Sequence, residues 1–521
     1  MNGGSLMKLN YKRTVLVGFA FFLISAFWQA YDATIPVILT NKFGMSQTWS
    51  GVIMALDNIL AVFMLPIFGA LSDKCTAWSG KRTPFIRWGT IIAAVALIGL
   101  SFVDDAQRVN LAAVNQIDDP KGLYVIYDTQ SEKTLQTPDG EQFVLKDMFT
   151  KEAFAEIRSD YIDAETGESP YTNYVAPARQ AYAAEITKES PKELIVFVAL
   201  LLVVLVAMST FRSPAVALMP DVTIKPLRSK ANAVINLMGT AGGILVLVLG
   251  IVFATSAVKN QLMKYYAYYG VIAGIMLGAL AIFLATVREP QWAKEMQEES
   301  VRLGIEEEPE DTEVKRGLSK AEKRSLIFIL ASIALWYMGY NAVTSKYSVY
   351  AGNILNMDYN TTLLLAQAAA IVAYLPAGMV ASKIGRKKTI LAGVVMLTTA
   401  FAAASFLRAG SSVMLMNILF ALAGIGWATI NVNSFPMVVE MCSGGDVGKY
   451  TGFYYTASMS AQIVTPMLSG FLMDLDGIGM TALFPYAAIF AGLAFLTMLF
   501  VKHGDAKPES KKGLEALDID D

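Results

Sequence analysis

The chain has 521 residues, of which 55% are hydrophobic and 17% are charged, and its mean hydropathy is +0.46. Soluble globular domains average about 45–50% apolar and about 25% charged residues. The composition therefore indicates a membrane protein, and it excludes a largely disordered chain. A net charge of −2 offers no basic surface to nucleic acid, so we expect no nucleic-acid partner.

The inventory of reactive side chains is small. The chain has two cysteines, Cys75 and Cys442, and one histidine, His503, which follows the last apolar segment. These numbers exclude a disulfide framework, a histidine-based catalytic triad and a zinc site within the membrane. We therefore expect no metal site and no cofactor.

Twelve apolar segments are long enough to cross a bilayer, which takes about 20 residues at 1.5 Å per residue. The first segment lacks a small-residue cleavage site, so we interpret it as a retained helix rather than a signal peptide. The predicted spans are 14–39, 49–71, 84–103, 194–218, 231–256, 265–287, 325–345, 361–382, 388–407, 412–438, 450–473 and 481–502.

The distribution of Lys and Arg between the spans predicts their orientation, because cytoplasmic loops carry the excess of both residues. With both termini in the cytoplasm, that side holds clusters such as Lys81–Arg82 and Arg386–Lys388. The outer connections then hold Lys42, Lys259, Lys264, Lys346 and Arg408. The opposite orientation would violate the rule throughout, so both termini are predicted to be cytoplasmic.

Two polar segments interrupt the spans. Residues 288–324 alternate in charge, which is typical of one or two solvent-exposed helices in a cytoplasmic linker. Residues 104–190 are acid-rich and form an outer insertion. Within the insertion, LYVIYD and EQFVL flank a TPDG turn and predict a β-hairpin, and 144–160 is predicted to be helical. A small ordered cap of mixed structure and a flexible insertion both remain open.

An internal repeat divides the chain. Leu65-Pro66 followed by Ser72-Asp73 recurs 310 residues later as Leu375-Pro376 followed by Ser382-Lys383. The repeat predicts an all-α membrane protein of twelve transmembrane helices in two six-helix, pseudo-symmetric bundles. The predicted parts are a first bundle (1–103 and 191–287), the insertion (104–190), the linker (288–324), a second bundle (325–502) and a tail (503–521).

Parallel six-helix halves are the repeat pattern of major facilitator transporters. The loop GALSDKCTAWSGKRTPFI (69–86) resembles that of the glycoside–pentoside–hexuronide:cation symporter family, nearest its proton–sucrose branch. The stretch PDVTIKPLRSKANAVINLMGTAGGI (220–244) resembles the same branch. The resemblance implies a major facilitator fold and a multi-pass protein of the plasma membrane, which we expect to work as a monomer. The insertion departs from the family pattern.

Charged residues near the cytoplasmic helix ends are predicted to act in gating. Such charges can pair across helices in one conformation and separate in another. The alternative is that they are solvated topology anchors. The candidates are Asp73, Lys81, Arg82, Asp221, Arg228, Arg386 and Glu440.

Three ionisable residues fall within predicted spans, where they are costly and functional by default. Asp57 lies about 4–5 Å and Asp32 about 8 Å outward of their helix centres, whereas Arg212 lies about 9 Å inward. We therefore expect Asp57 and Arg212 to face one water-filled cavity at different levels without a fixed salt bridge. Asp57 is the first candidate for a proton-coupling site and Asp32 is the second, with an outer-rim structural role as the alternative for Asp32.

Departures from the family pattern bear on the coupling ion. Sodium-using members carry two carboxylates four residues apart in helix two, whereas Ala61 and Leu65 occupy the matching positions here. A hard cation needs several oxygen ligands, so a proton is favoured over sodium. The sucrose branch has an arginine in helix four at the position of Val216, and Arg212 lies one turn earlier on the same face.

A sugar site needs amide or hydroxyl groups and aromatic faces. Aromatic residues in spans more often serve packing, and buried amides often bond between helices, so both alternatives remain. The candidates are Trp28, Gln29, Tyr31, Asn58, Asn236, Trp336, Tyr337, Tyr340, Asn341, Asn431, Asn433 and Gln462.

These residues predict a proton-coupled symporter of a disaccharide or related glycoside. The alternatives are a drug or metabolite exporter of the same fold, and a sensor whose insertion binds a ligand. A membrane-embedded enzyme is a further class, but 104–190 contains no nucleophile–base pair or nucleotide loop, so an enzyme is not expected.

Overall fold

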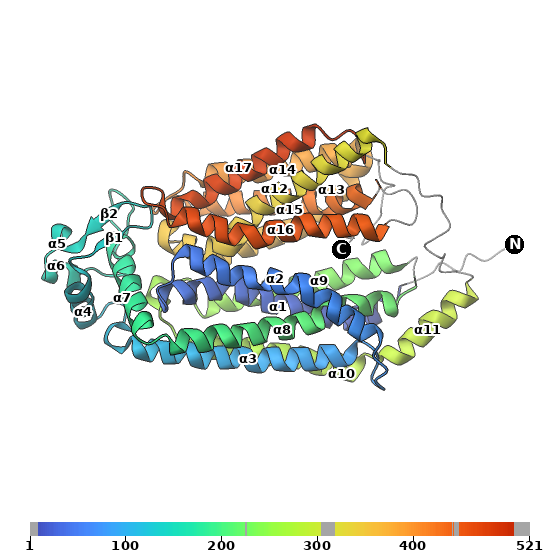
Figure 1. The fold of residues 1–521 in the computed structure, drawn as a ribbon, viewed down its shortest axis with the longest axis horizontal. Coiled ribbons are helices and arrows are strands. Elements are labelled where there is room, and N and C mark those ends of the chain that lie inside the picture. The colour runs from blue at the N-terminus through green and yellow to red at the C-terminus, as the bar shows by residue number, and fades with distance from the viewer. Residues whose placement is uncertain (1–8, 225–226, 304–317, 440, 442–446, 505–521) are drawn as a thin grey trace.

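The computed structural model describes residues 9–224, 227–303, 318–439, 441 and 447–504. Long helices form two layers that lie side by side, one from each half of the chain, and a small mixed unit covers one end of both (Figure 1). We call that end the insertion end. The opposite end, which carries helix α11, is the linker end. Glu440, 304–317 and nearly all of the predicted tail lie outside the described residues.

The first layer is built from the N-terminal part of the chain. Its helices are α1 (Tyr11–Asn41), α2 (Gln47–Asp73), α3 (Thr83–Asn110), α8 (Lys192–Asp221), α9 (Arg228–Val252) and α10 (Tyr266–Thr286). Buried Leu, Ile, Ala and aromatic side chains of these helices form one hydrophobic core. We call this layer the N-terminal half.

The second layer follows the linker and is called the C-terminal half. Its helices are α12 (Lys320–Tyr350), α13 (Tyr359–Ile384), α14 (Arg386–Ala404), α15 (Val413–Val439), α16 (Val447–Met473) and α17 (Leu483–Leu499). Short turns η5 (Ala351–Leu355) and η6 (Gly479–Ala482) adjoin α12 and α17. A second hydrophobic core, centred on residues such as Trp336 and Phe484, holds this half together.

Ten of the described helices are long and apolar enough to cross a membrane, so the chain is a multi-pass membrane protein. The other two predicted spans, 361–382 and 450–473, coincide with α13 and α16, which are 26 and 27 residues long. The number of membrane crossings, predicted as twelve, therefore stays a prediction.

The insertion is an ordered unit with its own small core, to which Leu123, Phe154 and Tyr171 contribute. Strands β1 (Thr134–Gln136) and β2 (Gln142–Val144) pair antiparallel around the TPDG turn. Its helical elements are η1 (Ala112–Val114), α4 (Pro120–Gln130), α5 (Leu145–Met148), α6 (Lys151–Ala155), η2 (Tyr171–Val175) and α7 (Ala176–Glu189).

The prediction of a strand at LYVIYD is wrong, because these residues belong to α4. The side chain of Asp119 accepts from the backbone N–H of Lys121, and Pro120 occupies the first turn, a combination that starts a helix. Leu123 and Ile126 then face the core of the insertion with helical spacing. The hairpin uses the shorter segment around residue 135 as its first strand instead.

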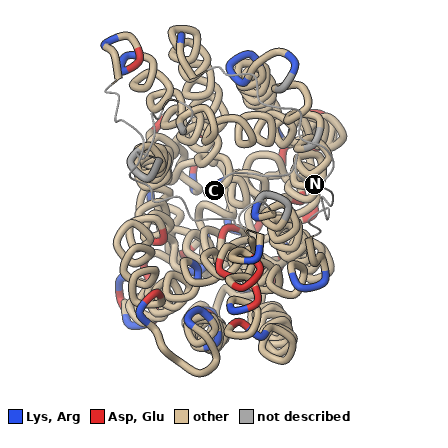
Figure 2. The backbone as a smooth tube through the Cα atoms, turned by 90° about the vertical axis from the view of Figure 1, so that its right-hand side faces the viewer, with Lys and Arg blue, Asp and Glu red and all other residues tan. Residues whose placement is uncertain are grey.

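The linker contains one described helix, α11 (Glu289–Arg302). It is not wholly solvent-exposed as predicted, since Glu289 and Trp292 are buried against the N-terminal half. Arg13 at the start of α1 holds it further through an ion pair of 2.6 Å with Glu295. Figure 2 views the molecule from the linker end, where Lys and Arg lie at the helix ends of both halves.

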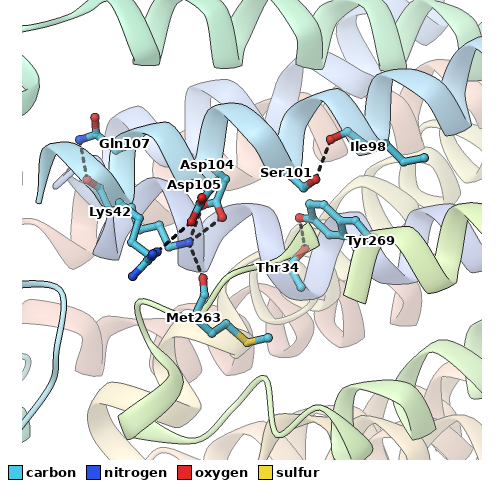
Figure 3. A network of polar contacts seen from close by, with 10 residues as sticks. Thr34, Lys42, Ile98, Ser101, Asp104, Asp105, Gln107, Met263 and Tyr269 are labelled. Atoms are coloured by element: carbon cyan, nitrogen blue, oxygen red, sulfur yellow. Dashed lines mark hydrogen bonds and ion pairs between the residues drawn. The ribbon is translucent and has the colours of Figure 1, made fainter. Parts of the chain in front are cut away.

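Two lysines predicted in outer loops are buried instead. Lys346 lies within α12, and Lys42 caps the end of α1. The Lys42 ammonium donates to both carboxylate oxygens of Asp104 at 2.7 and 2.6 Å and to the carbonyl of Met263 at 2.6 Å (Figure 3). Both side chains of the ion pair are fully buried. The pair thus fixes α1, α3 and the start of α10 together where the insertion begins.

We predict that Lys42→Met destabilises the protein by about 3–5 kcal/mol, because it leaves the Asp104 carboxylate buried without its partner. Thermal or denaturant unfolding of the purified protein in detergent measures the change. Lys42→Met/Asp104→Leu is the matched control and is expected to recover much of the loss, since a buried ion pair and an apolar pair are often similar in free energy. A single variant as stable as the unaltered protein would contradict the prediction.

Candidate functional site

A cavity of about 470 Å³ lies between the two halves, and we call it the central cavity. Helices α1, α8 and α9 contribute from the N-terminal half, and α12, α13, α14 and α15 contribute from the C-terminal half. Its polar and aromatic lining residues are Ser25, Trp28, Gln29, Asp32, Arg212, Asn236, Thr240, Tyr340, Thr344, Ser348, Gln367, Tyr374 and Trp427, with Phe21, Phe401 and Phe420. Six of the predicted site residues are therefore brought together here.

Helix α1 brings a charge and an aromatic ring to the same wall. Trp28 and Asp32 are four residues apart, so they lie on one face of the helix one turn from each other. The guanidinium of Arg212 on α8 lies 5.9 Å from the centroid of the Trp28 ring, within the range of a cation–π interaction. In the described part of the chain, no ion pair joins Arg212 to a carboxylate.

An amide pair bridges the two halves across the cavity. Gln367 on α13 donates from its Nε2 to the Oε1 of Gln29 on α1 at 2.5 Å. Asn236 on α9 lines the wall beside them. These amides supply donors and acceptors in the space between the halves, where a ligand with several hydroxyl groups would meet them.

A stacked aromatic pair forms part of the wall from the C-terminal half. The rings of Tyr340 and Trp427 lie parallel within 3°, with their centroids 3.7 Å apart. Tyr337 packs edge-on against Trp427 at 5.1 Å. Trp427 was missed by the sequence analysis, as was Gln367. Both lie in predicted spans, where the sequence does not distinguish an aromatic ring or an amide that lines a cavity from one that packs between helices.

Asp57, the first candidate for the proton site, lies beside the central cavity rather than among its lining residues. The Nδ2 of Asn58 donates to an oxygen of the Asp57 carboxylate at 2.8 Å, so this predicted sugar ligand bonds to the carboxylate instead. Arg212 and Asp32 both lie within electrostatic range of Asp57. The three ionisable residues of the spans thus form one group.

Several predicted sugar ligands lie outside the central cavity. Tyr31 packs edge-on against Trp28 at 5.4 Å, and Trp336 is buried in the core of the C-terminal half. Asn433 donates to the carbonyl of Thr429 in its own helix at 2.9 Å. The residues outside the lining are Tyr31, Asn58, Trp336, Tyr337, Asn341, Asn431, Asn433 and Gln462.

Three of the predicted gating charges, Asp73, Arg82 and Asp221, meet at the linker end of the N-terminal half. Arg82 forms ion pairs with Asp73 at 2.6 Å and with Asp221 at 2.7 Å, and its guanidinium also donates to the hydroxyl of Ser72. The side chain of Arg82 is only 7% exposed. One arginine therefore joins the end of α2, the start of α3 and the end of α8.

Glu289 of α11 completes this cluster. Its carboxylate accepts from the backbone N–H groups of Arg82 and Thr83 at 2.8 Å each, and so caps the start of α3. Gly80 has φ of +117°, and a Cβ there would collide with this carboxylate, so the turn requires glycine. The linker helix is thereby fixed to the N-terminal half, a contact that the sequence analysis did not predict.

Three of the other gating candidates are described by the structure. Lys81 is exposed. Arg228 donates to the carbonyl groups of Thr223 and Pro220, next to its own helix. Arg386 lies on the C-terminal half at the start of α14. Glu440 lies outside the described residues.

Comparison with known protein families gives two matches. Residues 182–373 and 361–518 match the model of the Major Facilitator Superfamily. Residues 16–115 match the model described as MFS/sugar transport protein.

Characterised relatives match over short stretches. The chain is 27% identical over 157 residues to the MFS-type transporter ppzB of Metarhizium rileyi. It is 32% identical over 77 residues to the human proton-associated sugar transporter A, and 36% identical over 70 residues to the sucrose transport protein SUC3 of Arabidopsis thaliana. The matches cover 30%, 15% and 13% of this chain and only 32%, 10% and 11% of those proteins.

Solved structures match over almost the whole chain. The inward open xylose transporter XylE from E. coli superposes with a TM-score of 0.57 at 15% identity, covering 97% of this chain and 99% of that one. A D-xylose-proton symporter gives a TM-score of 0.55 at 16% identity, covering 96% and 100%. At this identity the likeness establishes the fold.

We predict that Arg82→Lys loosens the connection between α2 and α3, because one ammonium cannot replace a guanidinium that bridges two carboxylates. Hydrogen–deuterium exchange of the backbone amides at 74–82 is expected to accelerate about tenfold. A tenfold change corresponds to the free energy of about one charge-assisted hydrogen bond, which the variant loses. Lys81→Ala is the matched control, since that neighbouring side chain is exposed. Equal exchange in the two variants would show that the cluster does not hold the connection.

Proposed function

This chain belongs to the major facilitator superfamily, and we propose that it is a secondary active transporter that carries a sugar together with a proton. The observation that carries the proposal is the central cavity, which joins sugar-binding chemistry to ionisable groups between two separate helical halves. In alternating access, such halves rock around a central site and expose it to one side of the membrane at a time.

The lining of the cavity supports a sugar as the substrate. Gln29, Gln367 and Asn236 offer amide donors and acceptors from both halves, and Trp28 and Trp427 offer aromatic faces. Sugar rings combine hydroxyl groups with apolar C–H faces, which suits this mixture of side chains. A cavity of about 470 Å³ is large enough for a disaccharide or a related glycoside, which we propose as the substrate class.

The ionisable residues support a proton as the coupling ion. Asp32 lines the central cavity, and Asp57 lies within electrostatic range of both Asp32 and Arg212. A proton taken up by either carboxylate removes the charge repulsion between Asp32 and Asp57. It also weakens the electrostatic attraction between that carboxylate and Arg212. Substrate and proton therefore act on one group of side chains. We assign the coupling role to Asp57 and Asp32, with Arg212 as their counter-charge.

The charge distribution supports an orientation with the linker end in the cytoplasm. Basic residues lie at the helix ends on that side (Figure 2). They include Lys81 and Arg82 in the connection from α2 to α3, and Arg386, Lys387 and Lys388 at the start of α14. Cytoplasmic loops carry this excess in membrane proteins. We therefore propose that both termini are cytoplasmic, that the insertion faces outward, and that the protein works as a monomer in the plasma membrane.

Uptake into proteoliposomes tests the proton coupling. With an imposed pH gradient, the protein is expected to accumulate radiolabelled sucrose or maltose, and a protonophore is expected to abolish accumulation. Asp57→Asn and Asp32→Asn should each lower gradient-driven accumulation about tenfold or more, yet retain sugar exchange, because a neutral amide resembles the protonated carboxyl group. Glu152→Gln, on the exposed surface of α6, is the control.

Two results would count against this proposal. Accumulation that survives the protonophore would exclude proton coupling and leave a sugar carrier of another kind. If no glycoside is taken up or competes for binding, the symporter itself is excluded, and export of a less polar compound becomes the function to test.

The aromatic pair gives a separate prediction. Trp427→Ala is expected to raise the KM for the transported sugar about tenfold, because a lost aromatic contact weakens binding by about 1.4 kcal/mol. Trp427→Phe keeps a ring against Tyr340 and is expected to restore most of the affinity. Equal KM values for the alanine variant and the unaltered protein would place the sugar elsewhere in the cavity.

A further inference from the structure

One short connection of the C-terminal half receives contacts both from the N-terminal half and from the insertion. This connection, residues 474–480 between α16 and α17, is called the docking loop. The first contact is with α2. The carboxylate of Asp474 accepts from the backbone N–H groups of Gln47 and Thr48 at 2.8 and 2.7 Å, and from the Thr48 hydroxyl at 2.6 Å. The first helical amides of α2 are therefore capped by a residue of the other half.

Lys346 strengthens this contact from the same half. Its ammonium donates to the carbonyl of Gln47 at 2.6 Å, and its side chain is fully buried. The cap that α2 carries itself is weak, since Ser46 accepts from the N–H of Trp49 only at 3.4 Å. The start of α2 thus depends on the C-terminal half for its polar partners.

The second contact is made by the hairpin of the insertion. Backbone N–H groups of Gly477 and Met480 donate to the carbonyl groups of Gly140 and Pro138 at 2.7 Å each. The side chain of Gln136 donates to the carbonyl of Leu475 at 3.0 Å. The tip of the hairpin therefore docks on the same seven residues that hold α2.

The insertion itself is fixed to the N-terminal half. The side chain of Gln107 on α3 donates both to the Lys42 carbonyl at 2.9 Å and to the Thr187 hydroxyl of α7 at 3.0 Å. Gln180 of α7 donates to the side chain of Asn41 at 3.1 Å. Helix α7 then leads directly into α8. The hairpin must therefore move with the N-terminal half, whereas the docking loop moves with the C-terminal half.

We propose that the insertion is part of the gate at the insertion end. The docking loop binds the start of α2 through Asp474 and binds the hairpin of the insertion, and both must leave it before the central cavity can open toward that side. The proposal rests on the alternating access described above, although not on which sugar is carried. It gives the insertion a role that the resemblance to sugar symporters leaves unexplained.

Two glycines of the docking loop provide a matched test. Gly479 and Gly477 both have left-handed backbones, with φ of +58° and +73°, so alanine strains both positions alike. A Cβ at Gly479 would collide with the backbone of Pro138 and Gly140, whereas a Cβ at Gly477 meets no atom within 4 Å. Gly479→Ala should therefore undock the hairpin, and Gly477→Ala should not.

The readout is a distance across the insertion end, measured by pulsed electron paramagnetic resonance in liposomes. Spin labels are placed at Lys264→Cys and Val413→Cys, which are exposed residues of the two halves, in a Cys75→Ser/Cys442→Ser background. Gly479→Ala is expected to raise the ratio of long to short distances about tenfold, because the hairpin bonds to the docking loop are lost. Gly477→Ala is expected to leave the ratio unchanged.

An unchanged ratio in a folded Gly479→Ala protein would overturn the proposal. A raised ratio supports it even if the unaltered protein carries no sugar, a result that would overturn only the proposed substrate. If Gly479→Ala fails to fold, the pair Asp139→Cys/Ile478→Cys replaces it, since Gly479 packs on the backbone of Asp139 and Gly140 packs on the backbone of Ile478. Oxidation should then stop opening at this end, with recovery on reduction. Unimpaired opening with the disulfide formed would likewise overturn the proposal.

Discussion

A charged or polar side chain that is buried away from water must find its partner within the protein, because an unpaired buried charge is costly. Much of the arrangement described above follows from this constraint. Lys42 is surrounded by three oxygen acceptors, and Lys346 reaches the first carbonyl of a helix in the other half. Each buried charge fixes the helices around it. The central cavity is the contrasting region, where Asp32 and Arg212 face space that a ligand or water can occupy.

The same constraint explains why the two ends of the molecule differ. At the linker end, Arg82 and Glu289 join helices of the N-terminal half to one another and to α11. At the insertion end, Asp474 and Lys346 join the two halves to each other. Bonds of the first kind survive a rocking motion, because all their members move together. Under the proposed alternating access, bonds of the second kind have to break before the insertion end can open, so they contribute to the free-energy difference between its closed and open states.

The sequence predicted the helices well because a span is a property of local composition. Asp32 and Arg212 could be recognised as unusual for the same reason, since a charge in an apolar segment needs no partner to be noticed. Trp427 and Gln367 could not, because an aromatic ring or an amide in a span is as often packing as site, and only the contact between helices decides. The prediction of a strand at LYVIYD was wrong because it gave the apolar pattern more weight than the Asp119-Pro120 helix start, which prevails in the structure.

The bond between Gln29 and Gln367 bears on how tightly the central cavity holds a ligand. These two amides already share one hydrogen bond across the halves, so a hydroxyl group of a ligand that displaces it exchanges one hydrogen bond for others and gains little net free energy. A molecule with one or two hydroxyl groups gains too few new hydrogen bonds to offset the one that it breaks. A ligand with many hydroxyl groups can bond to both amides at once. In the proposed transporter, this exchange favours ligands with many hydroxyl groups over simple alcohols, and it keeps the net binding free energy small enough for rapid release.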